Sequence, residues 1–142
     1  MKKKAGTKKL ITIGRHVMID LPDLDSYGVE AKVDTGAFRT VIHCNSWKEV
    51  DVDGVKMLEA QFDLNDDGVK TIRFKDYFQK EFKSSFGEKE SRYCVKTLIK
   101  IGSKKIKSSV SLTDRSDMRF QVLLGRKTLL RKYLVDVSRK YV

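Results

Sequence analysis

Hydrophobic and polar residues alternate with a period of two along much of this chain. Because successive side chains of a β-strand point to opposite faces, each alternating segment is predicted to be a strand with one buried face. Such segments recur over the whole length, at residues 10–13, 17–21, 29–33, 93–101, 106–112 and 118–124. The pattern favours an all-β protein.

Two turns between these strands can be assigned from their residues. Asp53 and Gly54 separate two alternating segments, and an Asp-Gly pair favours a two-residue hairpin because both residues tolerate a positive φ. Gly102 begins a second turn, between the strands predicted at 93–101 and 106–112. Both turns join neighbouring antiparallel strands.

One short helix is predicted near the C-terminus, where Leu129, Leu130 and Tyr133 recur at helical spacing within residues 126–134. The 142 residues include one Pro, nine Gly and 35% charged residues, which fits a single globular domain. We place this domain at residues 10–142 and interpret residues 1–9 as a basic, disordered tail.

The charge of the chain is unevenly distributed. Thirty Lys and Arg against 19 Asp and Glu give a net charge of +11, and five of the positive charges lie in residues 1–9. Residues 10–68 hold five basic and twelve acidic residues, whereas residues 69–142 hold twenty basic and seven acidic ones. A basic second half attracts anionic partners such as acidic peptides or nucleic acid, although a solvated basic surface is the commoner case.

The composition also bears on the cellular compartment. No hydrophobic segment approaches the ~20 residues that span a bilayer, so no membrane association is predicted. Cys44 and Cys94 are the two cysteines, too few for a disulfide-stapled secreted scaffold. We expect free thiols and a cytoplasmic protein.

Candidate chemistry begins with Asp34-Thr35-Gly36-Ala37, directly after the strand predicted at 29–33. The motif places a carboxylate at the end of a strand, followed by a hydroxyl and by a glycine that permits a tight turn. By itself, such a motif also occurs where the aspartate only begins a turn. A second landmark, Leu124-Gly125-Arg126, ends an apolar strand immediately before the predicted helix.

Together these two motifs resemble the retropepsin half-barrel of retroviral-type aspartic peptidases. More closely, residues 11–142 resemble a bacterial family of retropepsin-like proteins that is often labelled ATP-dependent zinc protease and is associated with ribosomal-protein glutamate ligases. The other segments that carry the resemblance are Ile13-Gly14-Arg15, Ile42-His43-Cys44, Arg92-Tyr93, residues 111–118 and Leu134-Val135-Asp136.

The resemblance implies an all-β, retropepsin-like fold with one short C-terminal helix. It also implies that the segment Leu124, Gly125 and Arg126 crosses behind the loop that carries the catalytic residues Asp34, Thr35 and Gly36. In this family Thr35 would tie the two loops of a dimer together, and Gly36 would bring a backbone amide close to the carboxylate.

The chemistry of this family requires a second carboxylate. An aspartic peptidase uses two carboxylates about 3 Å apart that share one proton, because like charges that close cannot both ionise. The chain contains a single Asp-Thr-Gly. Catalysis therefore requires a homodimer in which each copy supplies Asp34.

Substrate contacts are predicted for residues in two places: Ala37, Phe38 and Arg39 after the motif, and Phe86 and Gly87 in a flap tip at residues 83–88. Viral retropepsins carry two acidic residues where this chain has Phe38 and Arg39, which removes the usual carboxylate partner of Arg126. We expect Arg39 to favour acidic, glutamate-rich substrates. The alternative is a solvent-exposed Arg39.

The sequence thus predicts an aspartic endopeptidase that hydrolyses a peptide bond with paired Asp34 carboxylates. The alternative is a non-catalytic module that binds acidic peptides and cooperates with a glutamate ligase. The two differ in oligomeric state, because a binding module can work as a monomer whereas the two-carboxylate site cannot.

Other chemistries receive less support from the residues. No cofactor and no metal site are predicted, because His-Glu-x-x-His is absent and the soft ligands are scattered. Residues 124–128 lack the glycine spacing of a phosphate loop. His43 and Cys44 are adjacent on a predicted strand and should face opposite ways, which argues against a Cys–His pair. Aromatic residues among the basic residues 70–92 could stack nucleic-acid bases, but packing is the favoured interpretation.

Overall fold

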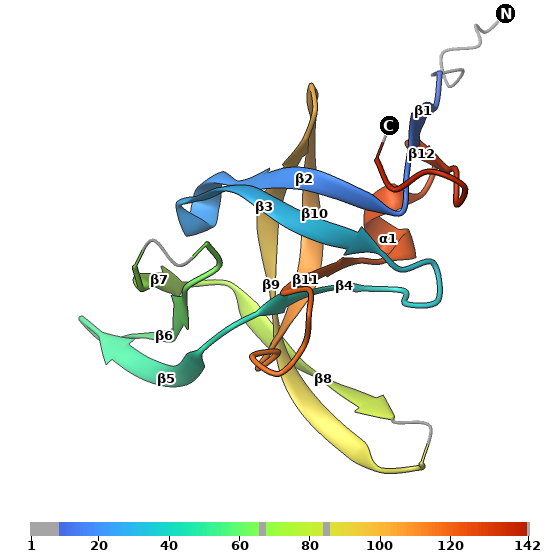
Figure 1. The fold of residues 1–142 in the computed structure, drawn as a ribbon. Coiled ribbons are helices and arrows are strands. Elements are labelled where there is room, and N and C mark those ends of the chain that lie inside the picture. Colours follow the sequence, from blue (N-terminus) through green and yellow to red (C-terminus); the bar gives the residue numbers. More distant parts are fainter. Residues whose placement is uncertain (1–8, 66–67, 84–85, 142) are drawn as a thin grey trace, which may run out of the picture.

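The structure is a computed structural model that describes residues 9–65, 68–83 and 86–141. Of the predicted tail only Lys9 is among the described residues, and Ser84 and Ser85 of the predicted flap tip also lie outside them. The described residues form an all-β fold with two short helices, the 3-10 turn η1 (Pro22–Leu24) and α1 (Arg126–Leu129) (Figure 1). The strands are β1 (Ile11–Ile13), β2 (His16–Leu21), β3 (Ser26–Val33), β4 (Thr40–His43), β5 (Ser46–Val52), β6 (Val55–Phe62), β7 (Lys70–Phe74), β8 (Tyr77–Lys83), β9 (Lys89–Ile101), β10 (Lys104–Thr113), β11 (Val122–Leu124) and β12 (Tyr133–Val135).

Six of these strands close into a barrel. Their order is β10-β4-β11-β3-β2-β9, and pairing between β9 and β10 completes the ring, while β8 adds to β9 outside it. Two of the pairings, β3 with β11 and β4 with β10, are parallel. Strand β11 therefore lies between β3 and β4, and the connection from β3 to β4 must pass around its end. This connection carries the Asp-Thr-Gly motif.

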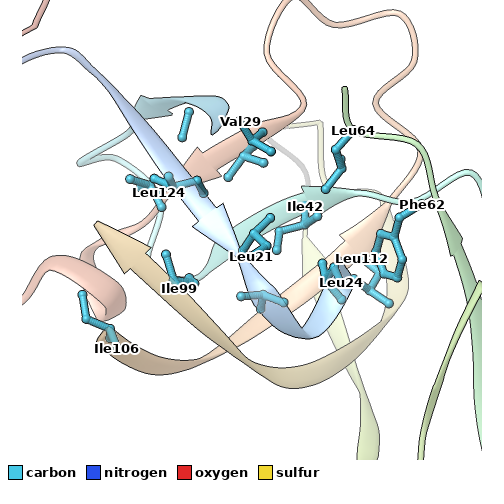
Figure 2. Packing of buried hydrophobic residues seen from close by; sticks show 14 of the residues in the cluster. Leu21, Leu24, Val29, Ile42, Phe62, Leu64, Ile99, Ile106, Leu112 and Leu124 are labelled. Carbon is cyan, nitrogen blue, oxygen red and sulfur yellow. The ribbon is translucent and has the colours of Figure 1, made fainter. Parts of the chain in front are cut away.

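The alternating residues of the barrel strands fill its interior. On β3, Val29 and Ala31 are buried and Lys32 is exposed, as period-two alternation predicts. Their neighbours in the core include Leu21 and Leu124, which are both fully buried (Figure 2). Burying a side chain of this size contributes roughly 1.5–3 kcal/mol. The core thus fixes the ends of β3 and β11, where the candidate site begins.

A separate three-stranded antiparallel sheet, in the order β5-β6-β7, packs beside the barrel through Leu58 and Phe62 of β6. The predicted hairpin joins its first two strands, where Val52 pairs with Val55. Asp53 (φ 52°) and Gly54 (φ 82°) both adopt the positive φ that the Asp-Gly pair favours. This turn prediction is confirmed.

The C-terminal segment differs in detail from the prediction. The predicted helix at 126–134 ends at Leu129, because Arg131 has a positive φ of 64° and Tyr133 begins β12, which pairs in parallel with β1. The strand predicted at 118–124 is shorter and begins at Val122. Neither described helix is long and apolar enough to cross a membrane.

Candidate active site

Asp34 stands directly after β3 and is half-buried. Its backbone N–H donates to the carbonyl of Leu124 at the end of β11 (2.9 Å), and its carbonyl accepts from the N–H of Ala37 (3.2 Å). The carboxylate oxygen Oδ1 accepts a hydrogen bond from the Gly36 N–H at 3.0 Å. A Cβ at position 36 would lie 3.3 Å from this oxygen, so glycine suits the close approach of the amide to the carboxylate.

The segment that follows β11 crosses behind this loop. The Arg126 N–H donates to the Ala37 carbonyl and the Lys127 N–H to the Phe38 carbonyl, both at 2.8 Å. A Cβ on Gly125 would lie 2.7 Å from the Phe38 carbonyl oxygen. The two segments are thus in backbone contact, and only glycine fits at position 125.

A chain of buried hydroxyl groups supports this crossing. The Gly125 N–H donates to Thr40 Oγ1 (3.0 Å), which lies 2.6 Å from Thr128 Oγ1. Thr128 Oγ1 is in turn 2.9 Å from Ser108 Oγ on β10. All three hydroxyl residues are buried. Nothing in the local sequence pattern around these residues indicates that they meet, because the contacting pairs lie 20 to 88 positions apart.

The side chain of Arg126 contacts the Thr35 carbonyl and the Phe38 ring. Its Nη1 donates to the Thr35 carbonyl at 2.9 Å, and its guanidinium carbon lies 5.8 Å from the centre of the Phe38 ring. A guanidinium over an aromatic face is attractive. Phe38 therefore contacts the arginine that also binds Thr35, and its side chain remains exposed.

Arg39 is half-buried rather than fully exposed. Its Nε donates to Ser109 Oγ at 3.1 Å, and Lys127 Nζ donates to the same oxygen at 2.9 Å. The guanidinium of Arg39 also lies 5.7 Å from the ring centre of Phe78 on β8. Arg39 thus connects the Asp34 loop to the base of the β8–β9 hairpin.

Four cations surround the buried thiol of Cys94 on β9. Burial raises the pKa of Cys94, and the positive charges of Arg39, Lys80, Arg92 and Lys127 act in the opposite direction. We call these four residues the basic cluster. Arg92 pairs with Glu90 (3.2 Å), whereas Arg39, Lys80 and Lys127 form no ion pair with a carboxylate of the described residues. The cluster therefore carries an excess of positive charge, and its members Arg39 and Lys127 lie beside the Asp34 loop.

The predicted flap residues lie at the far end of the β8–β9 hairpin (Figure 1). Phe86 is 91% exposed and Gly87 has a positive φ of 84°. The hairpin projects from the barrel, and Arg39 and Phe78 connect its base to the catalytic loop. The structure therefore brings Asp34 to Arg39 together with Leu124 to Arg126, and places Phe86 and Gly87 at a distance along the hairpin.

A cavity of about 320 Å³ opens beside Asp34. Its lining includes Asp34, Lys32, Arg115, Arg119 and Phe120. Arg115 and Phe120 belong to the loop 114–121 between β10 and β11. In the sequence, Arg115 lies in the segment 111–118 that carries part of the family resemblance, and Phe120 lies in the strand predicted at 118–124. The cavity contains three cationic side chains and one carboxylate.

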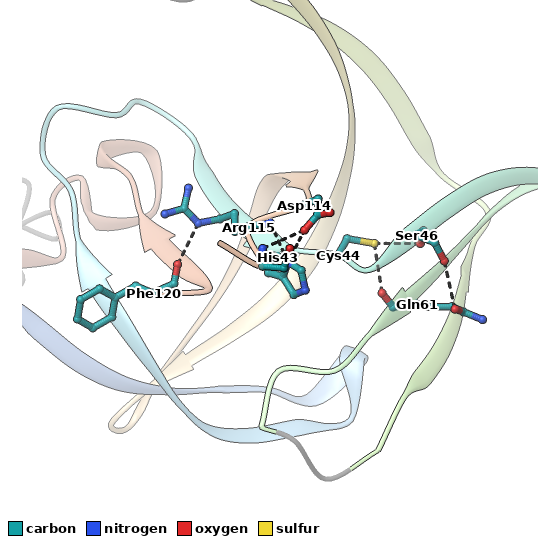
Figure 3. Close-up of polar contacts among 8 residues, drawn as sticks. His43, Cys44, Ser46, Gln61, Asp114, Arg115 and Phe120 are labelled. Atoms are coloured by element: carbon teal, nitrogen blue, oxygen red, sulfur yellow. Dashed lines mark hydrogen bonds and ion pairs between the residues drawn. The ribbon is translucent and has the colours of Figure 1, made fainter. Parts of the chain in front are cut away.

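His43 and Cys44 do not form a catalytic pair (Figure 3). His43 Nδ1 accepts from the Arg115 N–H at 2.8 Å, whereas Cys44 Sγ donates to the carbonyls of Ser46 and Gln61. Burial raises the pKa of the Cys44 thiol to about 12, which keeps it protonated and unreactive. Within the described ranges, no three His, Cys, Asp or Glu side chains gather as a metal site would require.

The chain is similar to part of several longer proteins. In Shewanella pealeana, a probable alpha-L-glutamate ligase is 29% identical over 132 residues, and the match covers 91% of this chain but 29% of the ligase. A probable alpha-L-glutamate ligase of Parasynechococcus marenigrum is 26% identical over 133 residues, which cover 92% of this chain and 28% of that protein. The chain thus spans less than a third of the length of these relatives.

The fold matches a solved structure. The crystal structure of protein Lpg0085 of Legionella pneumophila, of unknown function (DUF785), superposes with a TM-score of 0.76. It is 24% identical and the match covers 95% of this chain and 98% of that one. Residues 12–142 match the family model described as RimB-like, retropepsin-like aspartic endopeptidase RimB. The chain therefore belongs to the RimB-like family of retropepsin-like aspartic endopeptidases, as the resemblance indicated.

Proposed function

We propose that this protein hydrolyses peptide bonds as a homodimer, with Asp34 of each copy at a shared site. The observation that carries the proposal is the geometry of the Asp34 loop, which is held by backbone hydrogen bonds to Leu124 and Arg126. These bonds fix the backbone of the loop, and the hydrogen bond from the Gly36 N–H to Oδ1 orients the half-buried carboxylate. A single chain supplies one such carboxylate, so a two-carboxylate site is incomplete without a second copy.

The proposed reaction follows from two carboxyl groups that share one proton. The ionised Asp34 takes a proton from water, and the resulting hydroxide adds to the carbonyl carbon of the substrate. The protonated Asp34 donates its proton to the carbonyl oxygen. The tetrahedral intermediate then collapses and the C–N bond breaks. The leaving amine takes the proton that the first Asp34 removed from water, and a hydroxyl of the intermediate returns a proton to the second Asp34, which regenerates the pair. The apparent pKa values belong to the pair of carboxyl groups and not to either copy.

We further propose that the substrate is acidic. The basic cluster supports this, because Arg39, Lys80 and Lys127 lack carboxylate partners among the described residues, and Arg39 and Lys127 lie beside the loop. Carboxylates form short, charge-assisted hydrogen bonds with such groups. The named relatives are probable alpha-L-glutamate ligases, which suggests a glutamate-containing peptide or a functional link to a ligase.

The second candidate is a module that binds acidic peptides without cleaving them. It is favoured by the contacts of Phe38 and Arg39, which replace two acidic residues of viral retropepsins with an aromatic ring and a cation. This module would need the basic cluster but not the second carboxylate. Peptide binding that survives in a strict monomer supports it.

The two candidates are separated by incubating wild-type protein and Asp34→Asn with glutamate-tailed and neutral peptides from pH 4 to 8. Each reaction is run with and without a chelator, and products are identified by mass spectrometry. We expect chelator-resistant cleavage of the acidic peptides that is lost in Asp34→Asn. Binding without cleavage by either protein supports the module, and chelator-sensitive cleavage that survives the substitution contradicts the aspartic mechanism.

The requirement for two copies is tested by mixing subunits. Wild-type protein is unfolded and refolded with increasing amounts of Asp34→Asn, and sedimentation gives the oligomeric state of the mixture. If both carboxylates are needed, activity per wild-type subunit falls in proportion to the fraction of mixed dimers. Constant activity per wild-type subunit contradicts the shared site.

A further inference from the structure

The loop 114–121 brings a guanidinium to the cavity of Asp34, although its residues lie about 80 positions further along the chain. The Arg115 N–H donates to His43 Nδ1 (2.8 Å), and the Arg115 carbonyl accepts from the Met118 N–H (2.8 Å). The Ser116 N–H donates to Asp114 Oδ1 (2.9 Å). These three hydrogen bonds fix the backbone on both sides of Arg115. The position from which its side chain extends is therefore fixed as well.

The side chain of Arg115 is held at one nitrogen only (Figure 3). Its Nε donates to the Phe120 carbonyl at 3.0 Å. A guanidinium has five N–H donors in a planar fork, and no hydrogen bond or ion pair within the described part of the chain accounts for the other four. The residue is half-buried. Its terminal guanidinium nitrogens are not fully buried, so they are accessible to an external acceptor.

The charges around Arg115 show what kind of acceptor fits. Burial and the nearby charge of Arg92 lower the pKa of Arg115, and the charge of Asp34 acts in the opposite direction. Asp34 and Arg115 line the same cavity but form no ion pair, so the guanidinium is not neutralised. With Lys32 and Arg119 also in the lining, positive charge exceeds negative charge by two within one copy. An anion satisfies this arrangement better than a neutral group does.

We propose that Arg115 contacts the substrate and binds a carboxylate side chain next to the bond that Asp34 hydrolyses. The planar fork matches a carboxylate through two parallel N–H···O bonds. The assignment rests on the proposed function, since it names the residue that recognises an acidic side chain of the substrate close to the scissile bond. It differs from the predicted contact of Arg39, which lies toward the β8–β9 hairpin.

The alternative is a purely structural Arg115 that fastens the loop through Phe120. A structural role predicts that its replacement lowers stability and weakens binding of acidic and neutral peptides alike. A substrate contact predicts a loss confined to one acidic position of the peptide. Binding to the Asp34→Asn protein separates the two without any cleavage step.

The experiment measures affinities of labelled peptides for Asp34→Asn with and without Arg115→Met. The peptides are a hexaglutamate segment, six versions each with one Glu→Gln change, and an all-Gln control. We expect Arg115→Met to weaken the hexaglutamate peptide roughly tenfold, the size of one hydrogen-bonded charge pair. We also expect that, in the Arg115→Met protein, the Glu→Gln change at one position of the peptide, and at no other, no longer alters the binding affinity.

Arg73→Met is the matched control, because it removes the same charge from β7, where Arg73 pairs with Glu59 (3.0 Å). Arg115→Lys keeps the positive charge but lacks the planar guanidinium, and it replaces Arg115→Met in the experiment if that variant does not fold. Three results would each overturn the inference. Arg115→Met could weaken binding of the Glu and all-Gln peptides equally, or it could leave the effects of all six Glu→Gln changes unaltered. In the third, the Asp34→Asn protein has no affinity for hexaglutamate. Position-specific coupling in a protein that cleaves nothing would refute the proposed hydrolysis and leave the Arg115 contact standing.

Discussion

His43 and Arg115 are joined by a hydrogen bond in which the imidazole Nδ1 accepts from the backbone N–H at 2.8 Å. The acceptor role requires Nδ1 to be unprotonated, so the proton of the neutral ring is on Nε2. The bond links the end of β4 to the loop 114–121 beside Asp34. Its strength therefore depends on the protonation state of a buried side chain.

We predict that this bond makes stability pH-dependent. Burial lowers the pKa of His43 below its usual value of 6.5, the charge of Arg115 lowers it further, and Asp114 and Asp63 oppose the change. Below pH 6.5 the unfolded chain binds more protons at this position than the folded chain does. The free energy of unfolding should therefore fall as the pH drops below about 6.5 and through the lower pKa of the folded state.

The variant His43→Asn checks this prediction, because its amide oxygen replaces the Nδ1 acceptor but does not titrate. Denaturant unfolding of wild type and variant from pH 4.5 to 8 should show a smaller loss of stability at low pH in the variant. Asp114→Asn controls for the carboxylate 3.7 Å from Nδ1. Parallel pH profiles of wild type and His43→Asn contradict the assignment.

Replacing Gly125 by Ala should destabilise the protein strongly. The added Cβ would lie 2.7 Å from the Phe38 carbonyl oxygen and from the backbone carbon of Arg39, so the catalytic loop must shift. Overpacking of this kind costs about 1–3 kcal/mol. Urea unfolding measures it, and peptide cleavage should fall with the loop displacement.

Gly102→Ala is the control for the loss of a glycine. Gly102 has a positive φ of 61° but no atom within 4 Å of an added Cβ. Its replacement should cost about 1 kcal/mol through backbone strain alone and leave the cleavage rate unchanged. If Gly125→Ala is no worse than this control, the close approach does not constrain the loop.

Replacing Thr128 by Val should lower stability by about 1–3 kcal/mol, because it leaves the buried hydroxyls of Thr40 and Ser108 without their shared partner. Thr71→Val, at an exposed position on β7, should change stability by less than about 0.5 kcal/mol. Thermal unfolding of both variants is the measurement. Equal stability of Thr128→Val and wild type would show that the hydroxyl chain contributes nothing.

Cys44 should not react with thiol reagents in the folded protein. Its thiol is buried, donates to two carbonyls and has a pKa of about 12, so the thiolate is scarce at pH 8. Mass spectrometry after brief iodoacetamide treatment should find Cys44 unmodified in native protein and modified in denaturant. Native-state labelling at a rate similar to that of a free cysteine would contradict the burial of this side chain.

Local pattern predicted much of the fold, since alternation marked β3 and the Asp53-Gly54 pair marked the β5–β6 turn. The local pattern failed where contacts with distant segments determine the structure. Met118 and Phe120 continue the alternation of β11, but the turn between Arg115 and Met118 folds this stretch into a loop. In the same way, pairing with β1 extends the chain at Tyr133, where the hydrophobic spacing alone predicted helix.

The site was predictable as far as its motifs and no further. The Asp34 and Gly125 motifs were identified through the family resemblance, which implied that they meet. The hydroxyls of Thr40, Thr128 and Ser108 were missed because threonine and serine on strands and helices are common and carry no distinctive spacing. Arg115 belonged to a recognised segment, but only the folded chain shows that it shares a cavity with Asp34.

The insertion of β11 between β3 and β4 has a consequence for biosynthesis. Asp34 leaves the ribosome well before its backbone partner Leu124 and the supporting Arg126, which follow much later in the sequence. A nascent or truncated chain that ends with β10 contains the aspartate but lacks the strand that orients it. The loop around Asp34 therefore acquires its geometry only after β11 and Arg126 have been synthesised, and chains that stop before β11 lack this arrangement.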